Sequence, residues 1–339
     1  MNLRFTIAIL AACLLPAQQT PVFRTDSSLA LVRFHVVNKN RYLTGLKPED
    51  VVLLEDGAPR KFTVFENATT ARRTVPVEMT LLFDTSGSVV DEGLLDPLAF
   101  KETLLDNLED VAIGVYGFDR NMKRYCGPTR DYPRLQAAFA ALGTGGAKGE
   151  PIELHLPPKR RADPNSGTWL YEAVAAVSRE AAATPGDATR MVLVFSDGLP
   201  STDSRPEDAA EVDRELGIPV YPVVLGHRKL MERMAEVQQS QQPSEAISGT
   251  LNYLMAKQNQ IMAFARLGEL TGGRSFDPPS ITLTVMRSVL SSMVGQVRTE
   301  YVIGFVPEAS GGPRPHKLEI RLREKDAGKV MGGTRTVVH

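Results

Sequence analysis

Cysteine is scarce in this chain, which contains only Cys13 and Cys126 among its 339 residues. Cys13 lies in an apolar N-terminal segment with the character of an export signal, so Cys126 is the one cysteine expected in the mature protein. A single cysteine excludes an intrachain disulfide bond. We therefore expect the core alone to stabilise the protein, even in an oxidising compartment, and we interpret Cys126 as a half-buried structural thiol.

The chain also lacks an excess of charge of either sign and is poor in aromatic side chains. Lys and Arg total 39, Asp and Glu total 40, and aromatic residues make up 6% of the sequence. This balance provides no extended positive field for a nucleic acid, and few rings are present to stack on bases. We expect no nucleic-acid partner. The length suggests about two globular domains.

The N-terminal segment 1–17 has the features of a secretory signal peptide. A basic region ending at Arg4 precedes the apolar stretch Phe5–Pro16, which is too short to cross a bilayer as a mature helix. We therefore expect export to the periplasm, the cell surface or the medium. Leu10–Cys13 also resembles a bacterial lipoprotein cleavage motif, and a lipidated Cys13 would place the protein on a membrane. The apolar residues that continue past Cys13 favour ordinary cleavage.

Short β-strands are predicted at both ends of the remaining chain. Leu29–Val37 alternates apolar and polar residues, and an Asp-Gly turn separates the predicted strands Val51–Leu54 and Lys61–Phe65. Residues 23–72 therefore form an N-terminal β-module, but its three or four strands are too few for an independent sandwich.

The C-terminal residues 299–339 supply further predicted strands, at Tyr301–Val306, Lys317–Leu322 and Thr334–Val338. We expect them to pair with residues 23–72 in one small β-sandwich, with the middle of the chain inserted between the two parts. Two separate β-modules are the alternative.

Residues 76–298 alternate between strand and helix patterns. Continuous apolar strands that alternate with helices predict an α/β fold, a doubly wound and mostly parallel sheet covered on both faces. The predicted strands are Thr80–Phe83, Val111–Phe118, Met191–Phe195 and Ile218–Leu225, and the predicted helices are Leu94–Leu108, Tyr132–Leu142, Trp169–Ala183, Glu207–Leu216, Ile261–Leu270 and Leu283–Arg298.

Two segments interrupt this alternation. Residues 143–167 are rich in Gly and Pro and contain the basic run Lys159–Arg161, whereas residues 227–248 are low in complexity and rich in Gln. We interpret both as surface insertions and Lys159–Arg161 as a solvated charge run. Partner contact near the upper edge of the sheet is the alternative.

Oxygen-bearing side chains stand at three positions that the predicted sheet brings together. Asp84, Ser86 and Ser88 follow one strand, Asp197 follows another, and Thr168 opens a helix between them. Taken singly, such residues also cap helices and form turns. Ligands of open α/β sheets bind outside the carboxyl ends of the strands. Two carboxylates and three hydroxyls without His or Cys favour Mg²⁺ over Zn²⁺.

The segment Asp84-Thr85-Ser86-Gly87-Ser88 resembles the Asp-x-Ser-x-Ser signature of the von Willebrand factor type A domain. Gly167-Thr168 and Ser196-Asp197-Gly198 are similar to later motifs of that family, in the same order. The resemblance covers residues 76–298. The flanking segments Leu46–Gly57 and Tyr301–Pro307 resemble those of exported bacterial proteins related to this family.

The resemblance implies a Rossmann-like fold and a metal-ion-dependent adhesion site. By this comparison, the hydroxyls of Ser86, Ser88 and Thr168 bind Mg²⁺, with Mn²⁺ or Ca²⁺ as alternatives, and Asp84 and Asp197 bind it directly or through water. An open coordination position accepts an Asp or Glu from a partner protein. The implied function is a non-enzymatic adhesion or assembly module. Trp169 stands where the family usually has a small residue, either facing a partner or in the core.

Other functional classes fit the residues less well. A Mg²⁺-dependent phosphotransferase of the haloacid dehalogenase type would use Asp84 as its nucleophile, but that chemistry needs a second acid where Ser86 stands. A serine hydrolase would need a Gly-x-Ser-x-Gly turn, which surrounds neither Ser86 nor Ser88. A decayed metal site is disfavoured because every expected ligand is present.

Overall fold

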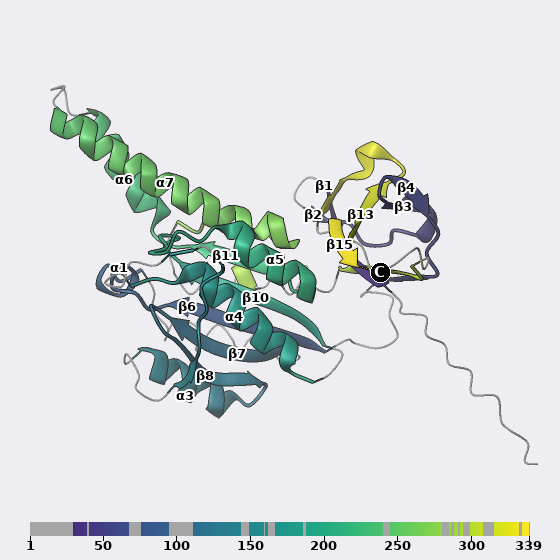
Figure 1. Cartoon of the computed structure of the whole chain (residues 1–339), viewed down its shortest axis with the longest axis horizontal. Helices are drawn as coiled ribbons and strands as arrows, with labels where there is room; N and C mark the ends of the chain where they lie inside the picture. Colours follow the sequence, from purple (N-terminus) through teal and green to yellow (C-terminus); the bar gives the residue numbers. More distant parts are fainter. Residues whose placement is uncertain are drawn as a thin grey trace, which may run out of the picture.

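The computed structural model describes residues 30–38, 41–67, 76–94, 111–143, 149–158, 160–161, 167–185, 188–239, 245–279, 285, 288–290, 292–293, 299–307, 315–331 and 334–338. The expected signal peptide 1–17 lies outside these residues, as do most of the helices expected at Leu94–Leu108 and Leu283–Arg298. The described part forms an α/β domain and a β-domain that lie side by side (Figure 1). None of the described helices combines the length and apolar character that crossing a bilayer requires.

The α/β domain is built on a six-stranded sheet with the order β11-β10-β6-β7-β8-β9. The strands β11, β10, β6 and β7 are parallel, and β8 and β9 add an antiparallel edge. This arrangement confirms the predicted doubly wound, mostly parallel sheet. The strand bounds are β6 Val77–Asp84, β7 Val111–Phe118, β8 Met122–Thr129, β9 Glu150–Ile152, β10 Thr189–Ser196 and β11 Val220–Val224.

Helices cover both faces of this sheet, because its inner strands are apolar on both sides. On one face Phe83 stacks on Phe195 with ring centroids 4.8 Å apart, and Phe139 of α3 packs edge-on against Phe83. On the other face Leu82 and its neighbours pack against α4, α5 and α7. The helix bounds are α1 Gly87–Asp91, α3 Tyr132–Gly143, α4 Leu170–Ala183, α5 Pro206–Leu216, α6 His227–Gln239 and α7 Glu245–Thr271.

Residues 227–248, which we interpret from sequence as a surface insertion, are helical in their described part. Residues 227–239 form α6 and residues 245–248 begin α7, and these two helices pack together and project from the domain (Figure 1). Their Gln, Glu, Lys and Met residues are good helix formers, and Arg228 pairs with Glu232 one turn later. Met234 on α6 and Leu254 on α7 are buried. The helix predicted to begin at Ile261 therefore begins at Glu245.

The β-domain contains two sheets, and each combines strands from both ends of the chain. One has the order β14-β1-β12-β5 with β2 beside β1, and the other has the order β15-β13-β3-β4. Thus β1 pairs with β12 and β3 with β13, and the predicted sandwich of N- and C-terminal strands is confirmed. The bounds are β1 Ala30–Asn38, β2 Arg41–Tyr42, β3 Val51–Glu55, β4 Ala58–Arg60, β5 Val64–Asn67, β12 Tyr301–Phe305, β13 Pro315–Leu322, β14 Lys329–Met331 and β15 Thr334–Val338, with short 3₁₀ helices at Pro48–Asp50 and Lys325–Ala327.

The strand predicted at Lys61–Phe65 is wrong in its bounds, because residues 61–63 connect β4 to β5 and only Val64 and Phe65 are in a strand. The Asp-Gly turn is present, with positive φ angles of 50° at Asp56 and 84° at Gly57, but the strand that follows it is β4. The chain then crosses over, and β5 pairs with β12 in the opposite sheet. Phe62, at the crossover, packs on the sandwich core and links the two layers.

Candidate metal centre

The candidate residues follow the central strands of the α/β sheet. β6 and β10 are parallel neighbours, and their register pairs Phe83 with Phe195. Asp84 and Ser196 therefore end the two strands side by side. The chain proceeds from β6 to β7 on one side and places β10 on the other, so this is where the strand order reverses. Such a point is the usual ligand position in an open α/β sheet.

Asp84 is completely buried at the end of β6. Its Oδ1 accepts a hydrogen bond of 2.9 Å from the backbone N–H of Ser86, and its Oδ2 accepts one of 2.6 Å from the Ser196 hydroxyl. Burial, and next the charge of Asp197, raise the pKa of Asp84 to about 6. Burial and the charge of Asp197 therefore destabilise the ionised form of Asp84, and a nearby cation would stabilise it.

Ser86 and Ser88 stand at the start of α1, and Ser88 lies in its first turn. Their hydroxyl oxygens lie 3.2 Å apart. Ser86 occupies the N-cap position of α1, yet its side chain makes no capping hydrogen bond. Helix capping therefore does not explain the presence of a hydroxyl at this position. Ser86 is buried, with 6% of its surface exposed. The two serines present adjacent oxygen donors beside Asp84.

Asp197 follows β10 and reaches the same loop. Its side chain is 5% exposed, and Oδ1 accepts a hydrogen bond of 3.1 Å from the backbone N–H of Leu199. Burial raises the pKa of Asp197, while a hydrogen bond from Ser88 and the charge of Lys257 act in the opposite direction. The hydrogen bond from Ser88 joins the first and third sequence motifs.

Thr168 is held beside these loops through its backbone. Its N–H donates to the Ser201 hydroxyl at 3.1 Å, and its carbonyl accepts from the N–H of Ser201 at 2.8 Å. The N–H of Trp169 donates to the carbonyl of Asp119, just after β7. Thr168 is buried, and Trp169, not Thr168, is the N-cap residue of α4. The loops after β7 and β10 thus fix the second motif next to the other two.

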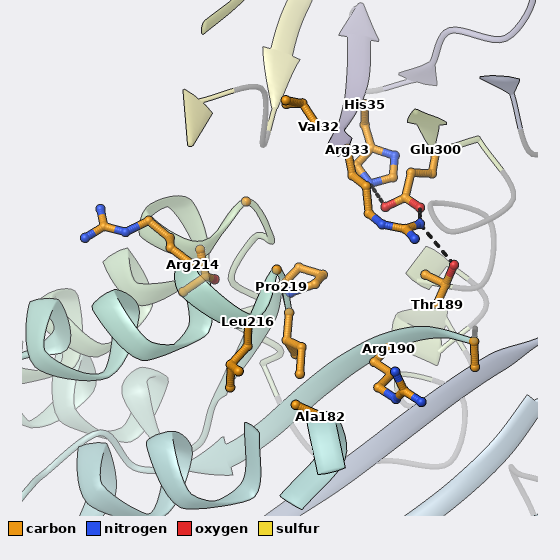
Figure 2. A pocket seen from close by; sticks show the side chains of 15 residues that line it. Val32, Arg33, His35, Ala182, Thr189, Arg190, Arg214, Leu216, Pro219 and Glu300 are labelled. Atoms are coloured by element: carbon orange, nitrogen blue, oxygen red, sulfur yellow. Dashed lines mark hydrogen bonds and ion pairs between the residues drawn. The ribbon is translucent and has the colours of Figure 1, made fainter. Parts of the chain in front are cut away.

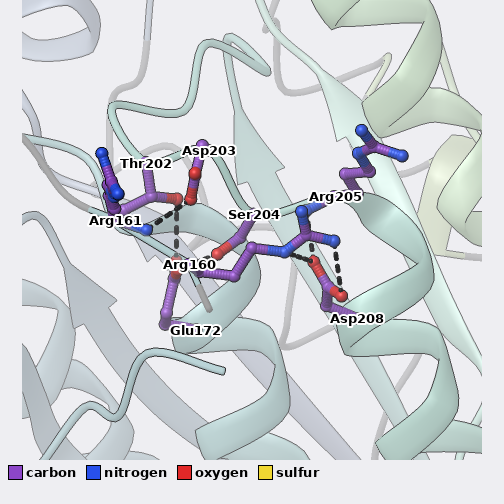
Figure 3. A network of polar contacts seen from close by, with 8 residues as sticks. All are labelled: Arg160, Arg161, Glu172, Thr202, Asp203, Ser204, Arg205 and Asp208. Carbon is purple, nitrogen blue, oxygen red and sulfur yellow. Dashed lines mark hydrogen bonds and ion pairs between the residues drawn. The ribbon is translucent and has the colours of Figure 1, made fainter. Parts of the chain in front are cut away.

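A polar network fixes the loop that follows Asp197 (Figure 3). The buried carboxylate of Glu172 on α4 accepts hydrogen bonds from Thr202 and Ser204. Arg160 forms a two-bond ion pair with Asp208 on α5, with both distances 2.9 Å. The interpretation of the Lys159–Arg161 run as solvated is therefore wrong for Arg160, which ties the segment before Thr168 to α5.

The donor set suits a hard cation. The four motif residues Asp84, Ser86, Ser88 and Asp197 contribute two carboxylates and two hydroxyls that contact one another in sequence. Thr168 is anchored through Ser201 to the loop that follows Asp197. Within the described ranges, no group of three or more His, Cys, Asp or Glu side chains is placed to hold a metal ion. An ion at this edge would therefore depend on hydroxyls and water for part of its coordination, as Mg²⁺ does.

Sequence reasoning missed two residues around this centre and the contact that a third one makes. Ser196 was noted as part of its motif, but its hydrogen bond to Asp84 follows only from the parallel register of β6 and β10. Lys257 and Glu92 both act on the pKa of Asp197. Neither belongs to a local motif, because α7 brings Lys257 to the site from 60 residues away in sequence.

A second cavity lies at the opposite end of the sheet, between the two domains (Figure 2). It has a volume of about 320 Å³ and is lined by residues of β1, α5 and the start of β10. Arg33 bridges the domains, donating to Glu300 at 2.7 Å and to Thr189 at 3.3 Å. His35 also faces Glu300, at 3.9 Å. These contacts make the cavity part of the domain junction.

This chain is similar to known proteins in its three-dimensional structure but not detectably in its sequence. Neither the family models nor the curated proteins contain a match to the chain. BatB, a conserved hypothetical protein from Bacteroides thetaiotaomicron, is 12% identical; the match covers 66% of this chain and 100% of BatB, with a TM-score of 0.41. An aerotolerance-related membrane protein from Bacteroides fragilis is 14% identical; the match covers 64% of this chain and 98% of that protein, with a TM-score of 0.40. Manganese-loaded TRAP from Plasmodium vivax is 12% identical; the match covers 85% of this chain and 98% of TRAP, with a TM-score of 0.34.

The doubly wound, mostly parallel sheet predicted for residues 76–298 is present. The motifs at Asp84 and Asp197 lie at the ends of β6 and β10, and Gly167-Thr168 lies just before α4. The identities and TM-scores are low, so the function proposed below depends on the residues of this chain.

Proposed function

We propose that this chain is an exported protein-binding module that grips an acidic side chain of its partner through a Mg²⁺ ion. The ion would be held by Asp84, Ser86, Ser88, Thr168 and Asp197. The observation that carries the proposal is the proximity of two buried carboxylates, Asp84 and Asp197, to the hydroxyls of Ser86 and Ser88. Ser86 is itself buried and makes no capping hydrogen bond, although it stands at the N-cap of α1. A divalent cation removes the repulsion between the two carboxylates and satisfies the hydroxyl oxygens.

Each residue has a distinct role in this proposal. Ser86, Ser88 and Thr168 offer neutral oxygens, while Asp84 and Asp197 balance the charge of the ion directly or through water. Because Mg²⁺ keeps water in its coordination shell, one position remains for a carboxylate of the partner protein. Mn²⁺ or Ca²⁺ would fill the same role. Binding would then require both the metal and an Asp or Glu side chain on the partner.

The geometry of Asp84 favours binding over phosphoryl transfer. A nucleophilic carboxylate needs an oxygen that faces its substrate, but Asp84 is completely buried and both of its oxygens accept hydrogen bonds. The position where a general acid is needed is occupied by Ser86, whose side chain makes contact with Ser88. These contacts support a non-enzymatic module.

Affinity capture tests the proposal. The chain without segment 1–17 is immobilised and exposed to an extract of the source cells in Mg²⁺ and, in parallel, in chelator. We expect a protein partner that elutes with chelator and is absent from a column carrying Asp84→Asn. Asp326→Asn, in the β-domain, is the matched control and should capture the same partner as the wild type. Capture that chelator and Asp84→Asn leave unchanged would contradict the proposal.

A further inference from the structure

We propose that the partner segment carries a second acidic side chain, and that Lys257 of the α6–α7 hairpin binds it in a groove beside the metal centre. This inference rests on the proposed function, because the first acidic side chain is the one that binds the metal ion. It adds a specificity element built by the hairpin, outside the three sequence motifs.

The groove opens directly from Asp197. It has a volume of about 260 Å³, and its walls come from the loops after β10 and β11 together with α6 and α7. On α7, Leu254, Lys257 and Ile261 recur at helical spacing and share one face. Leu254 and Ile261 are buried, so the backbone of α7 is fixed and Lys257 is held at the groove.

The charges in the groove favour an anionic occupant. Three cations, Lys229, Arg233 and Lys257, line it together with two acids, Glu92 and Asp197. Once Asp197 is committed to a metal ion, the cations outnumber the remaining acid. The ion adds further positive charge at the same end of the groove.

Lys257 is the cation that is available to a partner. Lys229 donates to the carbonyl of Glu92 at 3.2 Å, and Arg233 is paired with Glu236 at 2.9 Å. Among the described residues, the Lys257 ammonium has no carboxylate within ion-pair distance and lies 5.0 Å from the centre of the Tyr253 ring. Its charge lowers the pKa of Asp197, which places it within electrostatic range of the metal centre.

The groove also offers apolar contact. Leu199 and Leu230 are partly buried and line it beside Leu254. A chain segment that binds the metal through one carboxylate can therefore lay an apolar side chain on these leucines and place a second carboxylate at Lys257. A lone carboxylate, such as acetate, would use the metal alone. The expected occupant is thus an acidic peptide segment of a protein.

A peptide array distinguishes these alternatives. The probes are short Gly-Ser peptides that carry a fixed Asp, with Glu or Gln scanned through the neighbouring positions. The chain without segment 1–17 is applied in Mg²⁺ and in chelator. We expect Mg²⁺-dependent binding to every Asp peptide and about tenfold tighter binding when Glu occupies a favoured position. Lys257→Gln and Lys257→Glu should remove this preference for Glu and retain binding to single-Asp peptides. Lys325→Glu, in the β-domain, is the matched control.

The outcomes separate the inference from the proposed function. Mg²⁺-dependent binding with an unchanged preference for Glu in both Lys257 variants overturns the inference and leaves the metal site standing. Binding that does not depend on Mg²⁺, or no binding to any Asp peptide, overturns the proposed function and the inference together. Circular dichroism of each variant verifies that the fold is retained.

Discussion

The hydroxyl of Ser196 donates a hydrogen bond of 2.6 Å to Oδ2 of the buried carboxylate of Asp84. The same oxygen of Ser196 accepts a hydrogen bond of 3.0 Å from the backbone N–H of Gly198. This residue therefore connects the end of β6 to the loop that carries Asp197. It also lowers the pKa of Asp84 against the effect of burial. Ser196 positions the first carboxylate and shapes the loop of the second.

Ser196→Ala should weaken both the fold and the metal centre. The substitution leaves an oxygen of Asp84 and the N–H of Gly198 without their partner, which costs about 1–3 kcal/mol in the free energy of unfolding. Mg²⁺ affinity should fall about tenfold, because Asp84 loses the hydrogen bond that orients it. Urea unfolding and calorimetric titration measure the two effects. Wild-type values for both would show that Ser196 has no positioning role.

Metal binding should depend on pH through Asp84. The pKa of Asp84 in the metal-free protein is raised to about 6, so protons compete with the ion below that pH. The apparent Mg²⁺ affinity should therefore fall as the pH drops from 7 to 5, by about tenfold per unit below the pKa. Calorimetric titration at a series of pH values measures this. An affinity that stays constant over the range would contradict the assignment of Asp84 as a ligand.

The stability of the metal-free protein should rise as the pH drops, whereas its affinity for Mg²⁺ should fall. The folded pKa of Asp84, about 6, exceeds the ordinary value of 3.8, so the folded state keeps a proton that the unfolded chain releases between these values. The Asp84 contribution to stability is therefore present below pH 4 and is lost as the pH rises to about 6. Urea unfolding of the wild type and Asp84→Asn in chelator isolates this contribution. Identical pH profiles for the two proteins would contradict it.

Asp213→Asn should stabilise the protein at alkaline pH. Asp213 is completely buried on α5, where Ser178 is the one hydroxyl that acts on its carboxylate among the described residues. Burial raises its pKa to about 8, so the wild type loses stability as the pH rises from 4 towards 8. The neutral amide removes this loss. Thermal unfolding at pH 6 and pH 9 should give a larger gain in Tm at pH 9, and an equal or smaller gain there would contradict the prediction.

Arg33→Ala should loosen the contact between the two domains. Glu300 is buried, and the Arg33 guanidinium is its partner at 2.7 Å as well as the link to Thr189. We expect a loss of about 1–3 kcal/mol in the free energy of unfolding, since a buried carboxylate loses its partner. Arg321→Ala, which removes an exposed pair with Glu319, is the control and should change stability little. Equal effects from both variants would contradict this account of the junction.

Much of the α/β domain could be predicted from sequence, because its central strands are continuous apolar runs that end abruptly in polar residues. Asp84 and Asp197 both stand at such ends, and the parallel register then places them together. The sandwich was predicted from a shortage of strands at each end of the chain. Its crossover at Phe62 was not, because β4, Ala58–Arg60, has no β-branched or aromatic residue, and the run Phe62–Phe65 begins before β5 does.

The α6–α7 hairpin could not be predicted, and with it the groove beside the metal centre. Its buried positions, such as Met234 and Leu254, are sparse among Gln, Glu and Arg, so the apolar periodicity is weak. The position of Lys257 depends on the length of α7 and on its packing against β11. No local sequence pattern predicts the length of α7 or its packing against β11.

The most direct test of the account is anomalous X-ray diffraction from crystals of the protein grown with Mn²⁺, which substitutes for Mg²⁺ and has a strong anomalous signal. We expect one Mn²⁺ peak at the C-terminal end of β6 and β10, coordinated by Ser86, Ser88 and Thr168 with Asp84 and Asp197 directly or through water. Crystals of Asp84→Asn should lack this peak. A crystal saturated with Mn²⁺ that shows no peak at this position would contradict the central claim.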